Sequence, residues 1–524
     1  MKLRLQLVKT LFLVMIGGSV FMASAYHLNL FSFFCRVWTI LCVVVLCVFE
    51  SVTAWRQKGQ KFLVEGCIQS LFLVGTLELI YVAFQILEVI PSLNAFYCFT
   101  GSFNNPAILS MLLSLCVPCG IYQFSKTKNW KRYLWGCVTI VMIALIIAMK
   151  SRVGMICCLC SVLFMGISPK YPIATLLKRK KSVIVMSCIA CLLFIFLYSV
   201  KRDSADGRIL IWRVCLEMVA ERPLLGWGTD GFSAYYMPHQ ADYFVQHPNS
   251  RYAILADNIN HPFNEFLLFA VKYGCVGLTL LLATVFCLLK RVKAQKNPFK
   301  MVCLSMVISL VAWSLFSYPY RVSFVWLITA MMVLFVFYEV LKRYVFASVV
   351  LCLLCVCVAF VTMKKAVNEY RWLCVQERAS ECLDKQVLSE FENLHTLLKD
   401  KGNFLYNYGA ILHHIGRYHE SLTVLNECIS YFNDYKLQML MAHDLQEIKR
   451  YDEAVACYER ACQMVPSKFL PLYYEMRLYG ERRDDDNAWR VAQVIILKHP
   501  KRETASVRKI KYEAFLVYKK KGER

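Results

Sequence analysis

Residues 258–274, NINHPFNEFLLFAVKYG, place polar side chains at the entrance to an apolar segment. A histidine can accept a proton from a hydroxyl near neutral pH, and His261 stands where the polar run ends. Because Pro262 suits the first position of a helix, we expect His261 near the N-cap, where the helix dipole favours an anion. Asn264 and Glu265 follow within the next turn. The stretch predicts a general base beside an anion site, with Glu265 as an alternative base.

Three arginines have the chemistry to bind phosphate. Arg152 follows Ser151 after an apolar segment, and Arg208 and Arg213 lie early in a long polar loop. The planar guanidinium donates paired hydrogen bonds to phosphate oxygens, so these residues suit a diphosphate. The alternative stays open, because an arginine at a span end is often an interface anchor, and a histidine near a cap is often structural.

Metal chemistry is not indicated by the motifs. A zinc site made of His239, His247 and His261 would have a spacing that matches no known metal motif. The CVPC pair, Cys116 and Cys119, has no second pair at zinc-ligand spacing, and a packed bend at the intervening proline explains it better. The long loop also lacks the Asp-x-Asp signature of transferases that use nucleotide sugars. We therefore expect no metal ion and no cofactor.

These residues must be positioned by membrane helices. The chain has 524 residues, 58% of them hydrophobic, and its mean hydropathy is +0.47. Many apolar blocks reach the roughly 20 residues needed to cross a bilayer. We expect a polytopic all-α membrane protein, and we attribute the net charge of +24 to cytoplasmic loops rather than to nucleic-acid binding. About eleven spans are expected, near 8–25, 30–50, 62–90, 106–124, 133–149, 153–168, 182–200, 263–289, 301–317, 322–341 and 344–363.

The connecting loops alternate in charge, and this alternation predicts an orientation. Strongly basic segments occupy every second loop, whereas the loop at 91–105 has no Lys or Arg. The positive-inside rule then places the N-terminus in the cytoplasm. The 201–262 loop and everything after about 364 are expected on the other side of the membrane. The first 25 residues resemble a secretory signal, but the many spans that follow favour a retained first span.

The long loop is expected to be ordered. Apolar residues recur at helical spacing at Ile209, Trp212, Leu216 and Val219, and Pro223 should end this helix. The glycine-rich turn GWGTDGF follows. Loops of this length are usually functional or disordered, and the amphipathic pattern favours function.

After residue 364 the sequence turns polar and repeats itself. GRYHESLTVLNECI at 416–429 recurs as KRYDEAVACYERAC at 449–462, and a weaker copy stands at 484–495. The pattern resembles tetratricopeptide repeats, which stack into a short solenoid with a concave face. Two interpretations remain open, a stabilising cap and a docking site for a protein partner or acceptor. We predict a transmembrane domain at 1–363, a helical linker at 364–402 and repeats at 403–524.

The order of these motifs is similar to that of the O-antigen ligase and polymerase superfamily, which includes bacterial O-linked oligosaccharyltransferases. The motifs are SR at an outer span end, GR…W…RPLLGWGTDGF, and HPFNEFL…GCVGL. The resemblance implies transfer of a glycan from a polyprenyl diphosphate carrier to a hydroxyl acceptor outside the bacterial inner membrane. It implies that Arg152 and Arg208 hold the diphosphate, with Trp212 after the second arginine. It also implies that His261 activates the acceptor hydroxyl, with Asn264 beside it.

The sequence departs from the family pattern at two positions. Phe263 stands where a second histidine is common, which leaves His261 to act alone. Lys272 stands where an acidic residue usually precedes the glycine, and it could add to the anion site or pair with Glu265. We expect an inverting, metal-independent glycosyl transfer in which Arg213 has a lesser part.

Three acceptors compete: a lipid A core, a second lipid-linked glycan, and a protein hydroxyl, which the repeats favour slightly. Two other classes remain as rivals. A lipid-linked glycan transporter would place charged residues deep in the spans, where Glu78 and Glu88 are candidates. A non-catalytic scaffold would depend on the repeats alone.

Overall fold

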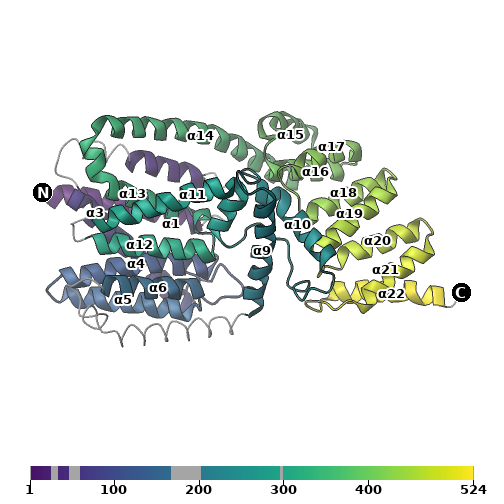
Figure 1. Ribbon diagram of the computed structural model, residues 1–524, viewed down its shortest axis with the longest axis horizontal. Helices are drawn as coiled ribbons and strands as arrows, with labels where there is room; N and C mark the ends of the chain where they lie inside the picture. Colours follow the sequence, from purple (N-terminus) through teal and green to yellow (C-terminus); the bar gives the residue numbers. More distant parts are fainter. Residues whose placement is uncertain (1, 25–33, 47–59, 167–201, 295–298, 523–524) are drawn as a thin grey trace. The chain divides into compact units, whose positions relative to one another are not determined.

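The computed structural model describes residues 2–24, 34–46, 60–166, 202–294 and 299–522 (Figure 1). Throughout these residues the regular secondary structure is helical, which confirms the predicted all-α class for the described part of the chain. The chain divides into two compact units. The first comprises Met1–Leu197 and Leu281–Ser380, and the second comprises Tyr198–Leu280 and Glu381–Arg524.

The first unit contains most of the apolar helices. Large side chains such as Trp313, Phe324 and Phe12 are fully buried in its core. Some buried hydroxyls pair across helices, as where the Trp313 indole donates to Ser114 Oγ at 3.1 Å, and this pairing lowers the cost of burying them. Its helices are α1 (Lys2–Ser24), an unlabelled helix at Phe34–Leu46, α3 (Gln60–Ile86), α4 (Pro106–Lys126), α5 (Lys131–Ala148), α6 (Arg152–Gly166), α12 (Lys300–Phe316), η2 (Pro319–Arg321), α13 (Ser323–Arg343) and α14 (Val345–Glu381).

Several of these helices suit a membrane by length and composition. Four helices in the described residues are long and apolar enough to cross a bilayer: Val64–Ile86, Pro106–Lys126, Lys131–Ala148 and Glu265–Ala294. Five shorter apolar helices stand at Val8–Ala23, Phe34–Leu46, Arg152–Leu163, Lys300–Phe316 and Ser323–Phe337. All nine coincide with predicted spans, and α14 covers the last one. The span predicted at 182–200 lies outside the described residues.

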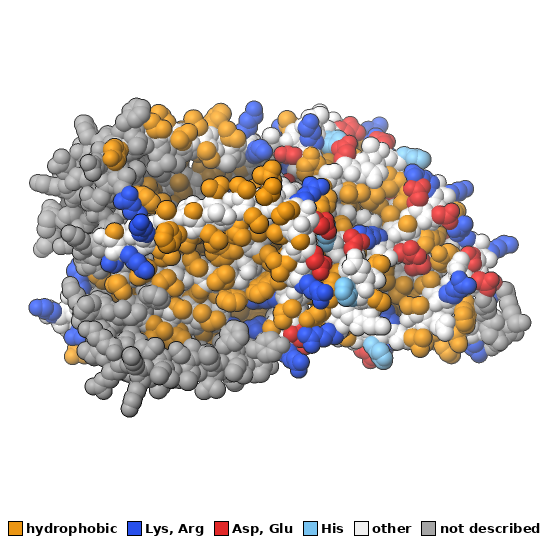
Figure 2. Space-filling view, in the orientation of Figure 1, with side chains coloured by type: hydrophobic (Ala, Val, Ile, Leu, Met, Phe, Trp, Pro, Cys, Tyr) orange, Lys and Arg blue, Asp and Glu red, His pale blue; other side chains and the backbone are white. Residues whose placement is uncertain are grey.

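Hydrophobic side chains remain on the surface of the first unit. The helix α5 is apolar, yet only 22% of its span is buried. On the face shown in Figure 2, orange side chains cover these helices, whereas acidic and basic side chains gather over the second unit. An uncovered apolar surface of this kind marks contact with lipid or another protein, and it supports a multi-pass membrane protein.

The two glutamates that were candidates for a transport pathway, Glu78 and Glu88, lie in places that do not suit that role. Glu78 is buried in α3, where Ser102 donates to its carboxylate from the backbone N–H at 3.0 Å and from the hydroxyl at 2.6 Å. Glu88 lies beyond the end of α3 at Ile86, in an exposed turn, so its predicted place inside the third span is wrong. Cys116 and Cys119 are buried in α4 on either side of Pro118, as a packed proline site predicts.

The second unit combines the long loop with the repeats. Its helices are α9 (Arg202–Glu221), α10 (Gly231–Gln246), the first part of α11 (Glu265–Ala294), α15 (Lys385–Leu398), α16 (Gly402–His414), α17 (Tyr418–Ile429), α18 (Tyr435–Glu447), α19 (Tyr451–Met464), α20 (Leu470–Glu481), α21 (Asp485–Leu497) and α22 (Ala505–Gly522). Helices α16 to α21 form three antiparallel pairs, and the three predicted repeat copies fall on α17, α19 and α21. The predicted tetratricopeptide-like helices are thus confirmed.

Small residues allow the paired helices to approach closely. A Cβ on Gly409 would lie 2.4 Å from Leu425 Cδ2, so a larger residue there would displace the Leu425 side chain. The Ser421 hydroxyl lies 2.6 Å from the Asp444 carboxylate and 2.9 Å from the Gly409 carbonyl, and its single proton is shared between these two acceptors. Asp444 also pairs with His413 Nδ1 at 2.6 Å. A buried carboxylate with these partners is fully hydrogen-bonded, and it fixes neighbouring helices against each other.

The loop helix α10 packs directly against repeat helix α19. Gln240 Nε2 donates to the Met464 carbonyl at 2.6 Å, and Arg460 forms an ion pair with Asp242 at 2.7 Å. The long loop and the repeats are therefore parts of one packed unit rather than separate modules joined by a linker.

Candidate functional site

The site is built around the turn that precedes α11. The helix begins at Glu265, and Asn264 caps it by accepting a hydrogen bond of 3.0 Å from the Leu267 N–H. The prediction that Pro262 occupies the first helical position is therefore wrong, and His261 precedes the cap by three residues. Asparagine is a better cap than histidine because its short oxygen reaches the orphan N–H groups. Asn264 thus shapes the turn through the backbone.

His261 is buried, with 5% of its surface exposed, and its ring is held from two sides. The backbone N–H of Phe263 donates to Nδ1 at 3.0 Å, and Nε2 lies 3.8 Å from Glu265 Oε2. A nitrogen that accepts from an N–H carries no proton, so the neutral ring carries its proton on Nε2, which faces the carboxylate. This geometry places an imidazole N–H opposite a carboxylate oxygen at 3.8 Å.

Two side chains of α9 hold the turn in place. The Trp212 indole donates to the Pro262 carbonyl at 2.9 Å, and the Arg208 guanidinium lies 5.1 Å from the centre of the Phe263 ring. Phe263 has φ +55°, a conformation that bulky residues rarely adopt. The cation–π contact and the indole hydrogen bond offset this strain. Phe263 therefore contacts Arg208 through its ring and His261 through its backbone N–H.

The helix α9 ends before Pro223 as predicted, but its buried face differs from the predicted one. Ile209 and Leu216 are 43% and 60% exposed. The interior residues are Leu210, Ile211, Val214, Cys215 and Met218, which pack against α10 and the turn. Burial raises the pKa of the Cys215 thiol well above its usual range, so this cysteine is not a nucleophile near neutral pH.

The glycine-rich motif docks on a break in α11. Gly274 has φ +65° and ψ −167°, which interrupts the helix and frees backbone groups. The N–H groups of Trp227 and Gly228 donate to the carbonyls of Val271 and Lys272 at 2.9 Å each. In return, the Cys275 N–H donates to the Pro223 carbonyl at 2.7 Å. The loop thus replaces the helix's own hydrogen bonds, as an interrupted membrane helix requires.

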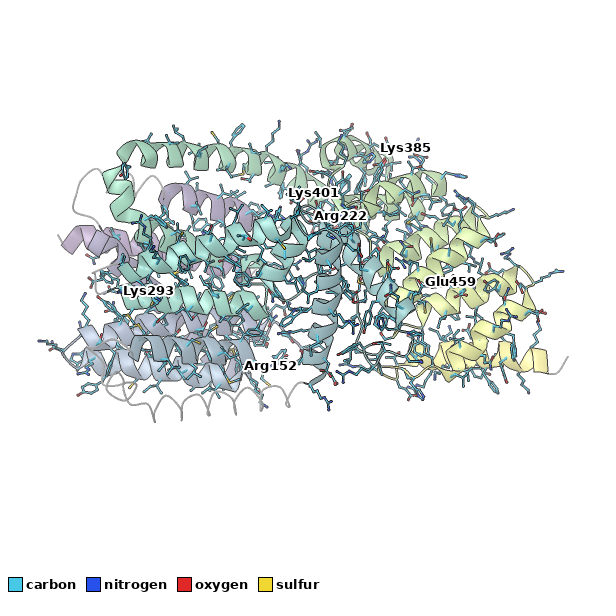
Figure 3. The ribbon with its side chains drawn as sticks, in the orientation of Figure 1. Arg152, Arg222, Lys293, Lys385, Lys401 and Glu459 are labelled. Atoms are coloured by element: carbon cyan, nitrogen blue, oxygen red, sulfur yellow. The ribbon has the colours of Figure 1, made fainter. Side chains whose placement is uncertain are left out.

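Trp227 is enclosed by aromatic and cationic side chains. Arg222, labelled in Figure 3 just after α9, lies 4.0 Å from its ring centre. Tyr235 lies 4.6 Å away, and the Trp227 indole donates to the Met218 carbonyl at 2.8 Å. These contacts anchor Trp227, and with it the loop that meets α11.

The other predicted residues occupy separate surroundings. Arg213 lies over the Tyr243 ring at 5.2 Å and near Glu217 at 3.5 Å. The backbone carbonyl of Lys272 accepts the hydrogen bond from the Gly228 N–H in the glycine-rich loop. Arg152 belongs to the first unit, where it begins α6 directly after Ser151, whose hydroxyl caps the helix through the Gly154 N–H at 3.3 Å (Figure 3).

The three histidines considered for zinc have different neighbours. His239 contacts Glu221 at 3.1 Å, and His247 stacks on Tyr243 at a ring distance of 4.6 Å. Within the described residues, no group of three histidine, cysteine or acidic side chains is arranged to hold a metal ion.

The helix break and its interlock with the loop were not predicted from the sequence. The signal was present in the glycine pairs of LLGWG and YGCVG, which stand about 45 residues apart. A Cβ on Gly226 would lie 2.6 Å from the Val271 carbonyl oxygen, and one on Gly274 would lie 2.1 Å from that of Leu224. Each glycine is needed because the backbone of the other motif passes close to it, and this approach is visible only in the structure.

Comparisons with known proteins agree with this organisation. Residues 137–282, from α5 to the first part of α11, match the O-antigen ligase family. Residues 435–467, which cover α18 and α19, match the tetratricopeptide repeat. No curated protein matches the chain. The resemblance derived from the motifs is thereby confirmed for these two segments, and it supports a membrane enzyme of glycan transfer.

Proposed function

We propose that the chain transfers a glycan from a polyprenyl diphosphate carrier to a hydroxyl acceptor, as an O-antigen ligase does. One observation carries the proposal. Arg208 and Trp212 of α9 are joined to the His261–Phe263 turn by a cation–π contact and a hydrogen bond. A phosphate-binding cation and a proton-transfer pair thus lie together, in a segment that matches this family.

The leaving group needs charge neutralisation. The acceptor oxygen attacks the anomeric carbon from the face opposite the diphosphate, and the bond from that carbon to the phosphate oxygen breaks, which inverts the centre. Arg208 binds the departing lipid diphosphate and stabilises its developing charge. Arg152, in the first unit, keeps the diphosphate-binding role that the family resemblance implies. Arg213 has a lesser part, because its guanidinium lies against Tyr243 and Glu217.

The acceptor hydroxyl must lose a proton as it attacks. We assign this proton to the His261–Glu265 pair. Because Nδ1 accepts from the Phe263 N–H and Nε2 carries the ring proton, the Glu265 carboxylate, 3.8 Å from Nε2, is the member of the pair that can accept the hydroxyl's proton. His261, the base that the family resemblance implies, faces this carboxylate with its Nε2–H. General-base catalysis contributes roughly a hundredfold to ten-thousandfold. No metal ion takes part in this scheme, so a chelator should leave the rate unchanged.

The site is assigned to the periplasmic side of a bacterial inner membrane, together with the repeats. The basic loops support this orientation. A lipid A core is the proposed acceptor. A second lipid-linked glycan would make the chain a polymerase, and a protein hydroxyl would make it an oligosaccharyltransferase. The transporter alternative is weakened because Glu78 is satisfied by Ser102 and Glu88 lies outside α3.

The test is a gel of lipopolysaccharide from a host that carries His261→Ala, compared with wild type. Loss of the long-chain ladder with the core retained would support a ligase, whereas core bearing one repeat unit would indicate a polymerase. His247→Ala is the matched control, since His247 stacks on Tyr243 in the same unit. An unchanged ladder in the His261 variant would refute both, and protein glycosylation would then be measured.

A further inference from the structure

A cavity of about 490 Å³ opens beside the turn, within the second unit. Such a volume lies in the range of small-molecule sites. Its walls come from α9, from the 254–259 segment, from Phe263 and from Lys501, which follows the last repeat pair. Arg208 and Phe263 have roles in the proposed reaction, but the other lining residues have none so far.

The lining combines hydrogen-bond donors with acceptors. Asp203 and Asp257 supply carboxylates, Arg208 and Lys501 supply cations, and Ser204 supplies a hydroxyl. A bare anion would be repelled by the carboxylates, and a cation by the arginine and the lysine. A hydroxyl both donates and accepts, so a group with many hydroxyls can satisfy both kinds of side chain. The aliphatic side chains of the wall and the Phe263 ring suit the apolar faces of a sugar ring.

The cavity adjoins the proposed reaction centre through shared residues. Arg208 and Phe263 line it, and the same two side chains contact each other at 5.1 Å. The Phe263 N–H also donates to His261 Nδ1. A sugar seated in the cavity would therefore lie next to the diphosphate-binding arginine and to the residue that orients the histidine.

The repeats hold one wall of this cavity in place through hydrogen bonds. The Ser467 hydroxyl donates to the Ala256 carbonyl at 3.2 Å, and Asn258 Nδ2 donates to Asp434 Oδ2 at 2.6 Å. Gln240 joins the same segment to α19, because its amide donates to the carbonyls of Asp257 and Met464. The repeats thus fix the 256–258 backbone, and the loop between α21 and α22 contributes Lys501.

We propose that this cavity is a saccharide subsite that binds sugar units of a substrate glycan, and that the repeat region completes it through Lys501. The inference rests on the proposed function and assigns its substrate class at this subsite. It gives the repeats a part in glycan recognition, with Lys501 and Asp257 as specificity-determining residues.

The test measures binding rather than turnover. Full-length protein in lipid nanodiscs is titrated calorimetrically with oligosaccharide released from the host's lipopolysaccharide by mild acid, and separately with inorganic pyrophosphate. Lys501→Ala and Asp257→Asn should each weaken oligosaccharide binding roughly three- to tenfold, the effect of losing one hydrogen bond. Asp257→Asn keeps the oxygen that accepts from the Asn258 N–H at 2.9 Å, so the wall stays intact.

Lys509→Ala is the matched control, because Lys509 is an exposed lysine of α22 outside the cavity. It should bind the oligosaccharide as wild type does. Equal affinities in all variants would overturn the proposal. Pyrophosphate binding that weakens in Lys501→Ala and tightens in Asp257→Asn, with the oligosaccharide unaffected, would overturn it in favour of an anion site.

The two proposals can fail separately. If the glycan-transfer function is wrong, the His261 variant keeps the wild-type ladder, while the oligosaccharide affinities remain measurable. If only the subsite is wrong, transfer is lost in the His261 variant and Lys501→Ala leaves the oligosaccharide affinity unchanged.

Discussion

The indole nitrogen of Trp212 donates a hydrogen bond of 2.9 Å to the carbonyl oxygen of Pro262. Fifty residues separate the partners in the sequence. The contact fixes the backbone between His261 and Phe263, so a loop helix sets the position of the proposed base. It also orients α9 so that Arg208 meets Phe263 on the same side.

We expect Trp212→Phe to lower kcat about two- to tenfold, because the ring stays while one hydrogen bond of about 0.5–1.5 kcal/mol is lost. The Pro262 carbonyl then has no indole donor, and the turn is no longer held by this bond. The measurement is the rate of glycan transfer by purified protein at saturating donor. Trp489→Phe, in the stacked pair with Tyr518 in the repeats, should leave the rate unchanged. A wild-type rate in Trp212→Phe would mean that the turn needs no support.

The His261–Glu265 pair should behave as one unit. Each of His261→Ala and Glu265→Gln is expected to lower kcat roughly a hundredfold or more. The double variant should be little slower than the worse single variant, since effects within one proton-transfer unit are not additive. The measurement is a double-mutant cycle, in which transfer rates are compared for wild type, the two single variants and the double variant. Multiplicative losses would show that the two residues act independently and would contradict the coupling inferred from their 3.8 Å separation.

The break at Gly274 should tolerate no side chain. Its φ of +65° with ψ −167° is strained for any L-residue, and the added Cβ would meet the Leu224 carbonyl oxygen at 2.1 Å. Gly274→Ala is expected to cost at least about 2 kcal/mol and to lower the apparent Tm in detergent. Gly480→Ala is the control, because nothing lies within 4 Å of its Cβ position in α20. Equal Tm values for both variants would argue against the interlock.

The helices of this protein were predictable because their signals are local. Apolar length indicated the spans, Pro223 indicated the end of α9, and the 33-residue repeat indicated the helix pairs. The start of α11 was misplaced because Pro262 and Asn264 are both good helix-start signals, and only the Leu267 N–H contact decides between them.

The motifs single out the residues of the proposed site, but they do not give its geometry. Arg208, Trp212 and His261 follow from the motifs. The contact of Phe263 with Arg208 could not be predicted, because the spacing of residues in the sequence does not indicate a cation–π contact between a helix and a turn. The buried face of α9 was misjudged for a related reason. Its interior is set by α10, and two possible apolar stripes, one with Ile209 and one with Leu210, run along the same helix.

Stability of the repeats should depend on pH through Glu475 of α20. Burial, and then the nearby charge of Glu459, raises the pKa of this carboxyl from 4.5 to about 7. The folded state therefore binds the proton more tightly than the unfolded chain. Stability falls as pH rises from about 4.5 to 7, and the penalty, on the order of 3 kcal/mol, is complete above that range.

We expect Glu475→Gln to slow hydrogen exchange of α20 amides at pH 8 and to leave it nearly unchanged at pH 5, after correction for intrinsic rates. Gln cannot ionise, so it removes the penalty only where the carboxyl would be charged. Glu503→Gln, at an exposed position before α22, should have no effect at either pH. Equal protection gained at both pH values would mean that packing rather than ionisation is responsible.

Asp434 links the repeats to the wall of the cavity. One carboxylate oxygen caps α18 through the Leu437 N–H at 2.9 Å, and the other accepts from Asn258 Nδ2 at 2.6 Å. Asp384 caps α15 in the same way, through the Val387 N–H at 2.7 Å. The two residues differ in the contact with the loop, which makes them a matched pair.

Asp434→Ala and Asp384→Ala should each lose about 1 kcal/mol of capping free energy. We expect Asp434→Ala alone to speed hydrogen exchange in the 254–259 segment, by roughly three- to tenfold, because Asn258 loses its acceptor. The measurement is peptide-resolved exchange of the full-length protein in nanodiscs. Equal exchange of this segment in the two variants would show that the repeats do not hold the wall. Faster exchange in Asp434→Ala alone would establish that the repeat region positions the loop beside Arg208.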